Sequence, residues 1–147
     1  MVKNIPTALY KQINRYLPIA CVDLVITDGK SFLLVKRRNR PQRGKWWLPG
    51  GRILKNETLV SAVKRKVREE TGLRARSIKE LGTYEFFSAE SEFLGIGRHN
   101  IAVSFIVKVA PGRVRLDGQS KDYFWAKCVS GSWHPYVRRV LRRAGFR

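Results

Sequence analysis

Apolar residues gather in short runs along this chain, and most of these runs have the composition of β-strands. Valine, isoleucine and aromatic residues dominate them, and turn residues separate them, as at 27–30 and 111–112. In the run 99–109 apolar residues alternate with smaller ones, which is the period of a strand. The predicted strands span residues 19–26, 31–35, 77–87, 99–109 and 122–126.

One acid interrupts the first predicted strand. Asp23 stands among Val22, Leu24, Val25 and Ile26. A carboxylate inside an apolar strand is costly unless it is hydrogen-bonded or faces a functional site. Asp23 is therefore a candidate functional residue.

A helix is predicted for about residues 57–71, because apolar residues recur there at every fourth position. Asn56 is the expected N-cap, and Glu57 falls in the expected first turn, where the helix dipole favours a carboxylate. Gly72 can adopt the left-handed conformation that ends a helix. The apolar stripe consists of Leu59, Val63 and Val67.

Two shorter helices are predicted near the ends of the chain. The segment 6–16 carries apolar residues at helical spacing and stops before Pro18, and the segment 134–144 forms a final helix with a basic outer face. The apolar positions of the first segment are Leu9, Ile13 and Tyr16. The basic residues of the second are Arg138, Arg139, Arg142 and Arg143.

Length and composition limit the possible classes of protein. The chain has 147 residues, of which 44% are hydrophobic, so we expect one globular domain over 1–147. No apolar run is long enough to cross a membrane, and residues 1–19 lack the apolar centre of a signal peptide. We therefore expect Cys21 and Cys128 to be reduced thiols in a cytoplasmic protein. The formal net charge of +19 favours anionic partners such as phosphates, nucleotides and nucleic acids.

The charged face of the predicted central helix indicates chemistry. Arg65 and Glu69 are four residues apart, as are Lys66 and Glu70, so each pair can lie on one face. Glu70 falls beside the apolar stripe and near the glycine turn at 49–51, where a carboxylate and a carbonyl can bind a hard divalent cation. The alternative is an ordinary amphipathic helix with two surface ion pairs.

The spacing of these residues matches a long motif. The matching residues are Gly51, Glu57, Arg65, Glu69, Glu70, Gly72 and Leu73. They resemble the signature box of the Nudix hydrolases, G-x5-E-x7-R-E-U-x-E-E-x-G-U, in which U is a bulky apolar residue. One fixed position differs, because Lys66 replaces a glutamate. The resemblance implies the α+β Nudix fold, a mixed β-sheet sandwiched between α-helices. It also implies metal-dependent attack on a nucleoside-diphosphate-linked substrate.

Several stretches are similar to one Nudix branch, the GDP-mannose mannosyl hydrolases. The likeness is strongest over 18–73, in the strand acid Asp23, the K-R-x-N-R-P run at 36–41 and the G-G-R-I-x-K-x-E-T-L run at 50–59. In that branch water attacks the anomeric carbon of the sugar, and nucleoside diphosphate leaves. The resemblance also implies a homodimer in which an aromatic residue near the N-terminus, here Tyr10, stacks on the base.

The same resemblance assigns roles to particular residues. One divalent cation, Mg²⁺ or Mn²⁺, neutralises the leaving diphosphate, and arginines take up charge on the departing oxygen. The expected metal ligands are Gly50 through its carbonyl, Glu69, Glu70 and Gln119. The expected substrate-binding residues are Tyr10, Arg37, Arg52 and Arg65. The expected catalytic residues are Asp23, Arg37, Arg52 and Glu70.

The base that activates water is left open by the sequence. In the related branch a histidine in the loop after the matching glutamine supplies it, and Ser120 stands at that position here. A serine is no base at neutral pH without an activator of its own. The side chains that can replace it are those of Asp23, Glu90, Glu92, His99 and Asp122.

Two other functions fit the same residues. Common Nudix chemistry directs water at phosphorus and uses several box carboxylates with metal ions. Lys66 places a cation about one turn from Glu70 and should weaken such a cluster by repulsion. The other alternative is a basic domain that binds nucleotide or RNA without turnover, through the arginines of 138–143. The preferred interpretation is a hydrolase that attacks a GDP-sugar at carbon.

Overall fold

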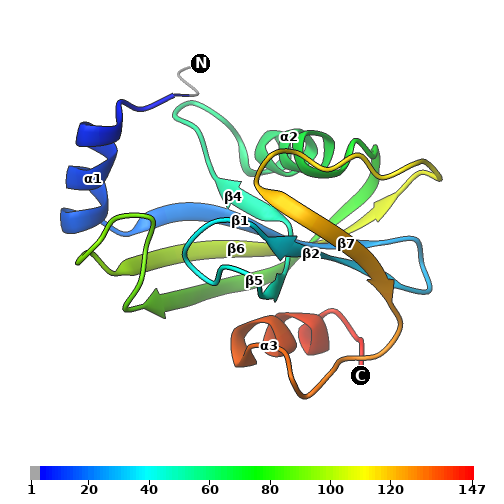
Figure 1. Ribbon diagram of the computed structural model, residues 1–147. Helices are drawn as coiled ribbons and strands as arrows, with labels where there is room; N and C mark the ends of the chain where they lie inside the picture. The colour runs from blue at the N-terminus through cyan, green and yellow to red at the C-terminus, as the bar shows by residue number, and fades with distance from the viewer. Residues whose placement is uncertain (1–3) are drawn as a thin grey trace.

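A mixed β-sheet lies between two helices in the computed structural model, which describes residues 4–147. Helix α2 (Leu59–Thr71) covers one face of the sheet and α3 (Pro135–Arg143) covers the other, while α1 (Thr7–Tyr16) lies at one end (Figure 1). The predicted class, a mixed sheet sandwiched between helices, is confirmed.

The sheet has seven strands, and its main path runs in the order β3-β2-β1-β6-β5. Their bounds are β1 (Ile19–Thr27), β2 (Phe32–Arg37), β3 (Trp46–Trp47), β4 (Gly50–Arg52), β5 (Ala75–Ser88), β6 (Arg98–Val109) and β7 (Ser120–Ala126). Strands β1 and β6 are parallel, and the other pairings in the described part of the chain are antiparallel. Strand β4 pairs with β1, and β7 pairs with β2. The short β4 brings the glycine turn directly against the central strand.

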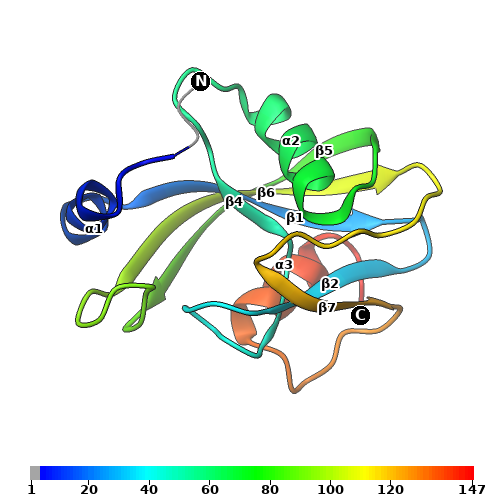
Figure 2. The ribbon, with the colours of Figure 1, turned by 45° about the horizontal axis from the view of Figure 1, so that its top comes forward.

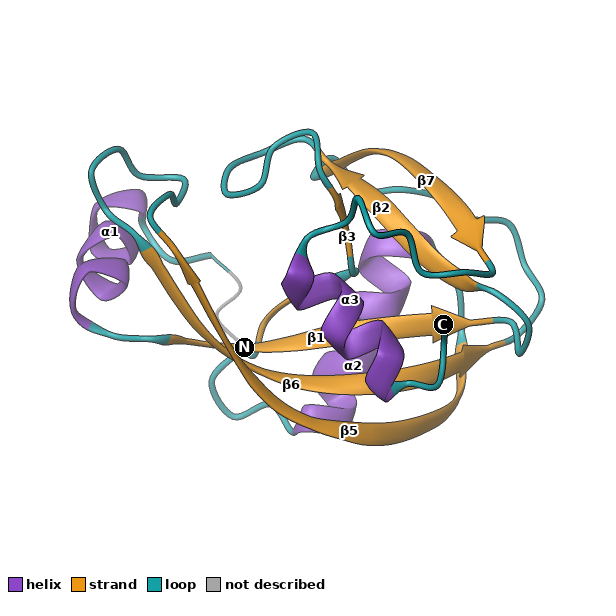
Figure 3. Ribbon diagram, turned by 90° about the horizontal axis from the view of Figure 1, so that it is seen from below, coloured by secondary structure: helices purple, strands orange, loops and turns teal. Residues whose placement is uncertain are grey.

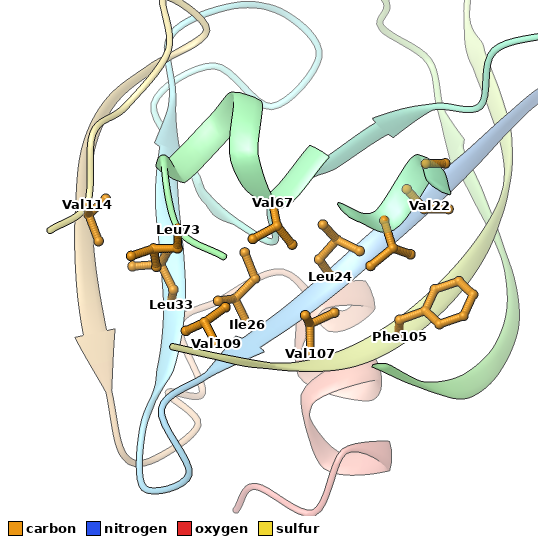
Figure 4. Packing of buried hydrophobic residues seen from close by; sticks show 12 residues of the cluster. Val22, Leu24, Ile26, Leu33, Val67, Leu73, Phe105, Val107, Val109 and Val114 are labelled. Atoms are coloured by element: carbon orange, nitrogen blue, oxygen red, sulfur yellow. The ribbon is translucent and has the colours of Figure 1, made fainter. Parts of the chain in front are cut away.

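Alternate residues of β1 face opposite helices. Val22, Leu24 and Ile26 are fully buried in the cluster beneath α2 (Figure 4), whereas Val25 belongs to the cluster beneath α3. A strand covered on both faces is apolar at nearly every position, which explains the apolar residues on both sides of Asp23 in the sequence. Asp23 lies on the same side of the strand as Val25 and therefore faces α3.

Helix α3 packs across the second face of the sheet (Figure 3). Its side chains Val137, Val140 and Leu141 are fully buried in a cluster with Phe32 and Leu34 of β2. Burying a side chain of this size contributes roughly 1.5–3 kcal/mol. The predicted basic helix therefore exists, and its apolar face holds it on the sheet.

Helix α1 packs at the end of the sheet, beside the loop between β5 and β6 (Figure 2). Tyr10 and Ile13 contact a small cluster of buried residues in β1 and β6. Of the three residues predicted to form the apolar stripe, Leu9 and Tyr16 are instead 54% and 74% exposed. The helix is confirmed, but its buried face is displaced by about one residue from the predicted stripe.

The start of α2 differs from the prediction. Thr58 is the N-cap, and its side chain accepts a hydrogen bond from the backbone N–H of Ser61. Asn56 is not the cap, because its φ of 65° places it in the left-handed region of a preceding turn. Glu57 also precedes the helix, so it does not lie in the first turn as predicted. Gly72 ends the helix with a φ of 70°, as predicted.

Candidate active site

A pocket of about 560 Å³ opens between α1, α2 and the loop that follows β2. Its floor is formed by β1 and β4, and Tyr136 of α3 closes it from the other side of the sheet. The predicted site residues that line it are Tyr10, Asp23, Arg37, Gly50, Arg52, Arg65, Glu69 and Gln119. The fold thus gathers nearly all of the predicted set, and Glu70 lies directly behind Gly50.

Gly50 lets the turn approach both β1 and α2. A Cβ atom at this position would lie 2.2 Å from the carbonyl oxygen of Val22, so only glycine fits. The backbone N–H of Gly50 donates a hydrogen bond of 3.1 Å to Oε2 of Glu70. This bond joins the turn to the last part of α2.

Glu70 is buried, with 5% of its surface exposed, and it is paired with a lysine. Nζ of Lys66 lies 2.6 Å from Oε1 of Glu70 and 3.8 Å from Oε2 of Glu69. Burial raises the pKa of Glu70, and the charge of Lys66 opposes that rise. The predicted i,i+4 pair is confirmed, but it is a buried pair at the pocket and not a surface pair.

Arg65 is fully engaged by its own chain. Its Nε and Nη2 donate to the two carboxylate oxygens of Glu57 at 2.6 and 2.8 Å. Its Nη1 donates to Glu69 at 3.1 Å, and Nη2 also donates to the carbonyl oxygen of Arg52 at 3.0 Å. The guanidinium therefore holds the end of β4, at Arg52, against α2. Direct contact of Arg65 with substrate stays a prediction.

The pocket is also lined by Arg37, Arg52 and Arg98. A register shift between Lys36 and Arg37 releases β2 from its regular pairing with β7, and Nε of Arg37 donates to the carbonyl oxygen of Pro41 at 2.7 Å. Burial lowers the pKa of Arg37. Arg52 and Arg98 both contact Tyr10.

Tyr10 makes these contacts within one chain. The guanidinium carbon of Arg52 lies 4.4 Å from the centre of the Tyr10 ring, and Nη1 of Arg98 donates to the Tyr10 hydroxyl at 3.1 Å. Phe93 packs edge-on against the same ring, with 5.7 Å between the ring centres. Tyr10 thus holds two pocket arginines in place. Its predicted stacking on a base across a dimer stays a prediction.

Asp23 lies at the floor of the pocket with a single close side-chain partner among the described residues. The Tyr136 hydroxyl donates a hydrogen bond of 2.5 Å to Oδ2 of Asp23. Burial raises the pKa of Asp23 to about 6, although the hydrogen bond from Tyr136 and the charge of Arg37 oppose the rise. A carboxylate with this pKa is ionised at neutral pH and can accept a proton.

Of the other candidate bases, one is paired with an arginine and the rest lie outside the pocket. Glu92 lines the pocket, but it pairs with Arg98. His99 stacks on Phe87 with 4.3 Å between ring centres, outside this pocket. Glu90, Asp122 and Ser120 do not line the pocket either. Asp23 is therefore the candidate that the geometry favours.

Sequence reasoning missed Arg98 and Tyr136. The hydrogen bonds of Arg98 to Tyr10 and of Tyr136 to Asp23 join residues 88 and 113 positions apart. Trp47 is 7% exposed and stacks on Tyr136 with 5.9 Å between ring centres. Arg98 immediately precedes the predicted strand 99–109, and Tyr136 lies near the start of the predicted helix 134–144, so no local spacing marks either residue as functional.

The predicted metal ligands do not fit a divalent cation as they are arranged. Oε1 of Glu70 is bonded to Lys66, and Oε2 accepts the N–H of Gly50. Glu69 pairs with Arg65. Within residues 4–147, no group of three or more His, Cys, Asp or Glu side chains is placed to hold a metal ion. A cation at Oε1 of Glu70 would have to displace the Lys66 ammonium.

The fold and the pocket together define a class: an α/β/α sandwich whose central helix carries the signature residues beside an arginine-lined cavity. The NUDIX domain family model matches residues 17–136. This chain belongs to the Nudix hydrolase family. Members of this family generally use divalent metal ions such as Mg²⁺ or Mn²⁺.

Named relatives agree with this assignment. The chain is 36% identical to the low-salt glycan biosynthesis protein Agl8 of Haloferax volcanii over 94% of this chain and 89% of that protein. It is 35% identical to an ADP-ribose pyrophosphatase of Methanocaldococcus jannaschii over 76% of this chain and 64% of that protein. The MutT protein structure from Methanosarcina mazei Go1 is 29% identical, with a TM-score of 0.72 over 86% of this chain and 92% of that one. The predicted Nudix fold is confirmed.

In the described part of the chain, 4–147, no helix is both long and apolar enough to span a membrane.

Proposed function

We propose that this protein hydrolyses a nucleoside-diphosphate-linked substrate, most specifically a GDP-sugar such as GDP-mannose, and releases the sugar and the nucleoside diphosphate. The observation that carries the proposal is the grouping of Arg37, Arg52 and Arg98 around one pocket with a half-buried carboxylate, Asp23, at its floor. Guanidinium groups match phosphate oxygens in charge and geometry. The names of two relatives, one in glycan biosynthesis and one acting on ADP-ribose, support a substrate of this class.

The proposed reaction uses Asp23 as the general base. A water molecule transfers a proton to the Asp23 carboxylate while its oxygen forms a bond to the anomeric carbon. The bond between that carbon and the phosphate oxygen breaks, and the electron pair stays on the oxygen. Arg37 and Arg52 stabilise the charge that develops on the departing diphosphate.

None of these steps uses a metal ion, because the carboxylate that would hold it is bonded to Lys66. Bound Mg²⁺ or Mn²⁺ stays a prediction from the sequence motif. A homodimer, a cytoplasmic location and weak binding to nucleic acid also stay predictions from the sequence.

Attack at phosphorus is the second candidate. It is favoured by the 35% identity to a protein named as a pyrophosphatase and by the retention of Glu57, Glu69 and Glu70 in the motif. In that reaction the diphosphate is split and the sugar keeps a phosphate. The two candidates differ in the atom that receives the solvent oxygen.

The test is hydrolysis of GDP-mannose and of ADP-ribose in heavy-oxygen water. Attack at carbon places the label on the free sugar, and attack at phosphorus places it on a phosphate. Arg37→Gln should lower kcat/KM by roughly 100-fold or more, as loss of a charge-stabilising group does. Arg43→Gln is the matched control, since Arg43 is exposed in the loop that follows β2 and does not line the pocket. Equal activity of the two variants, or no turnover of either substrate, contradicts the proposal.

A further inference from the structure

Lys66 is the one residue of the motif that differs from the family pattern, and it points into the site. Its side chain is 8% exposed and lines the pocket together with the arginines. A lysine substituted by chance on a helix surface would extend into solvent, because its charged end is strongly hydrated. This lysine is instead held at a functional surface.

The surroundings of Lys66 accommodate its length and its charge. A Cβ atom on Gly51 would lie 2.9 Å from Cε and 3.1 Å from Nζ of Lys66, so the glycine leaves the space that the lysine fills. Two carboxylates face the ammonium, Glu70 at 2.6 Å and Glu69 at 3.8 Å. A buried ammonium and a buried carboxylate at this distance neutralise each other, whereas either one alone would be costly.

These contacts are the ones that a divalent cation would make. A cation in the Nudix motif is expected beside Glu70 and Glu69 and next to the glycine turn, and the Lys66 ammonium has all three as neighbours. A positive charge on Nζ repels a second cation from the same carboxylates. The lysine and the metal are therefore alternatives at this place.

We propose that the Lys66 ammonium replaces the divalent cation and supplies positive charge to the diphosphate of the ligand. The inference rests on the proposed function, since it concerns the same pocket. Lys66 adds its positive charge to those of Arg37, Arg52 and Arg98, which line the same cavity. Diphosphate binding by this protein is accordingly independent of divalent metal.

Direct metal binding is the first test, and it needs no substrate. Titration of the full-length protein with Mn²⁺, followed by electron paramagnetic resonance, should show no saturable site up to about 1 mM. Lys66→Glu restores the acid of the motif and should create a Mn²⁺ site. Lys64→Glu is the matched control, because Lys64 is exposed on the same helix and the change in charge is identical. Saturable Mn²⁺ binding by the wild-type protein that Glu70→Gln abolishes would overturn the inference.

Binding of GDP, measured by calorimetry, is the second test. The wild-type protein should bind GDP equally in EDTA and in Mg²⁺. Lys66→Gln should weaken binding in EDTA by roughly thirtyfold or more, the usual effect of removing one partner of a buried charge pair. Lys64→Gln should leave it unchanged, and Lys66→Arg should retain most of it. Thermal melting of each variant shows whether the fold is intact.

Different results would contradict the role proposed for Lys66 and the proposed hydrolase function. Turnover of a nucleotide sugar that stops in EDTA and resumes with Mg²⁺ contradicts the role of Lys66 and leaves the hydrolase function in place. Metal-independent GDP binding that is lost in Lys66→Gln, without turnover of any nucleotide-linked substrate, supports Lys66 and contradicts the hydrolase function.

Discussion

At the scale of single residues, burial sets the chemistry of Asp23. Its pKa rises from 3.8 to about 6 because its partial burial at the pocket floor disfavours the charged carboxylate. The base should lose its negative charge as the pH falls through about 6, so kcat/KM should decline on the acid side of that value. Asp23→Asn should lower kcat by roughly 100-fold or more. The measurement is a pH–rate profile, and an acid limb that persists unchanged in the variant would contradict the assignment.

The same shift predicts an effect on stability. Between about pH 4 and pH 6 the folded protein binds more protons at Asp23 than the unfolded chain does, so the free energy of unfolding falls as pH rises through that window. Asp23→Asn removes this loss and can still accept the hydrogen bond from Tyr136. The free energy of unfolding of the variant minus that of wild type should therefore be larger at pH 8 than at pH 4, by up to about 3 kcal/mol. Urea denaturation at both values measures it, and a pH-independent difference would show that Asp23 does not titrate as described.

At the scale of elements, α2 shows what local sequence can and cannot determine. The helix, its buried valines and its end at Gly72 follow from spacing and from glycine conformation. The N-cap does not follow from local sequence, because Asn56 and Thr58 are both good capping residues. Which of them caps the helix depends on the hydrogen bond between Glu57 and Arg65. That contact spans eight residues and fixes the turn before the helix.

Two substitutions test whether Thr58 or Asn56 is the N-cap of α2. Thr58→Ala should lower the free energy of unfolding by about 1 kcal/mol, because the N–H of Ser61 loses its partner. Asn56→Gly should leave stability unchanged or raise it slightly, since the position has a φ of 65°. Urea denaturation of both variants measures the effects. A larger loss at Asn56 than at Thr58 would favour the cap expected from the sequence.

The strands, like α2, were only partly predictable from local sequence. A run that is apolar except at Asp23 predicts β1 as a buried strand, and the acid stands out within it as a candidate functional residue. Its partner Tyr136 lies 113 residues away, and only the packing of α3 across the sheet brings the two together. The site was therefore predictable where a motif joins its residues and unpredictable where distant elements meet.

At the scale of the whole molecule, the charge of +19 exceeds what one pocket requires. Arg139, Arg142 and Arg143 are exposed on α3, on the side of the sheet opposite α2. A surface of this kind binds polyanions through release of counterions.

Binding of single-stranded RNA should therefore weaken steeply between 50 and 200 mM salt, as is general for such surfaces. The triple variant Arg139→Gln, Arg142→Gln, Arg143→Gln should lower the slope of log affinity against log salt by roughly 2 to 3. Turnover of a small substrate should change much less, because these residues do not line the pocket. Filter binding at several salt concentrations provides the measurement, and no RNA binding at low salt would remove the nucleic-acid interpretation.

The attachment of α1 has a consequence for how the pocket opens. This helix is held by the smallest of the three hydrophobic clusters, yet its Tyr10 contacts both Arg52 and Arg98. Segments with few buried contacts separate from a fold at the lowest free energy. Each excursion of α1 would free two guanidinium groups from the tyrosine, and a ligand that engages both would hold the helix down. Amide exchange with solvent in 7–16 should then slow on ligand binding, although the helix itself need not touch the ligand.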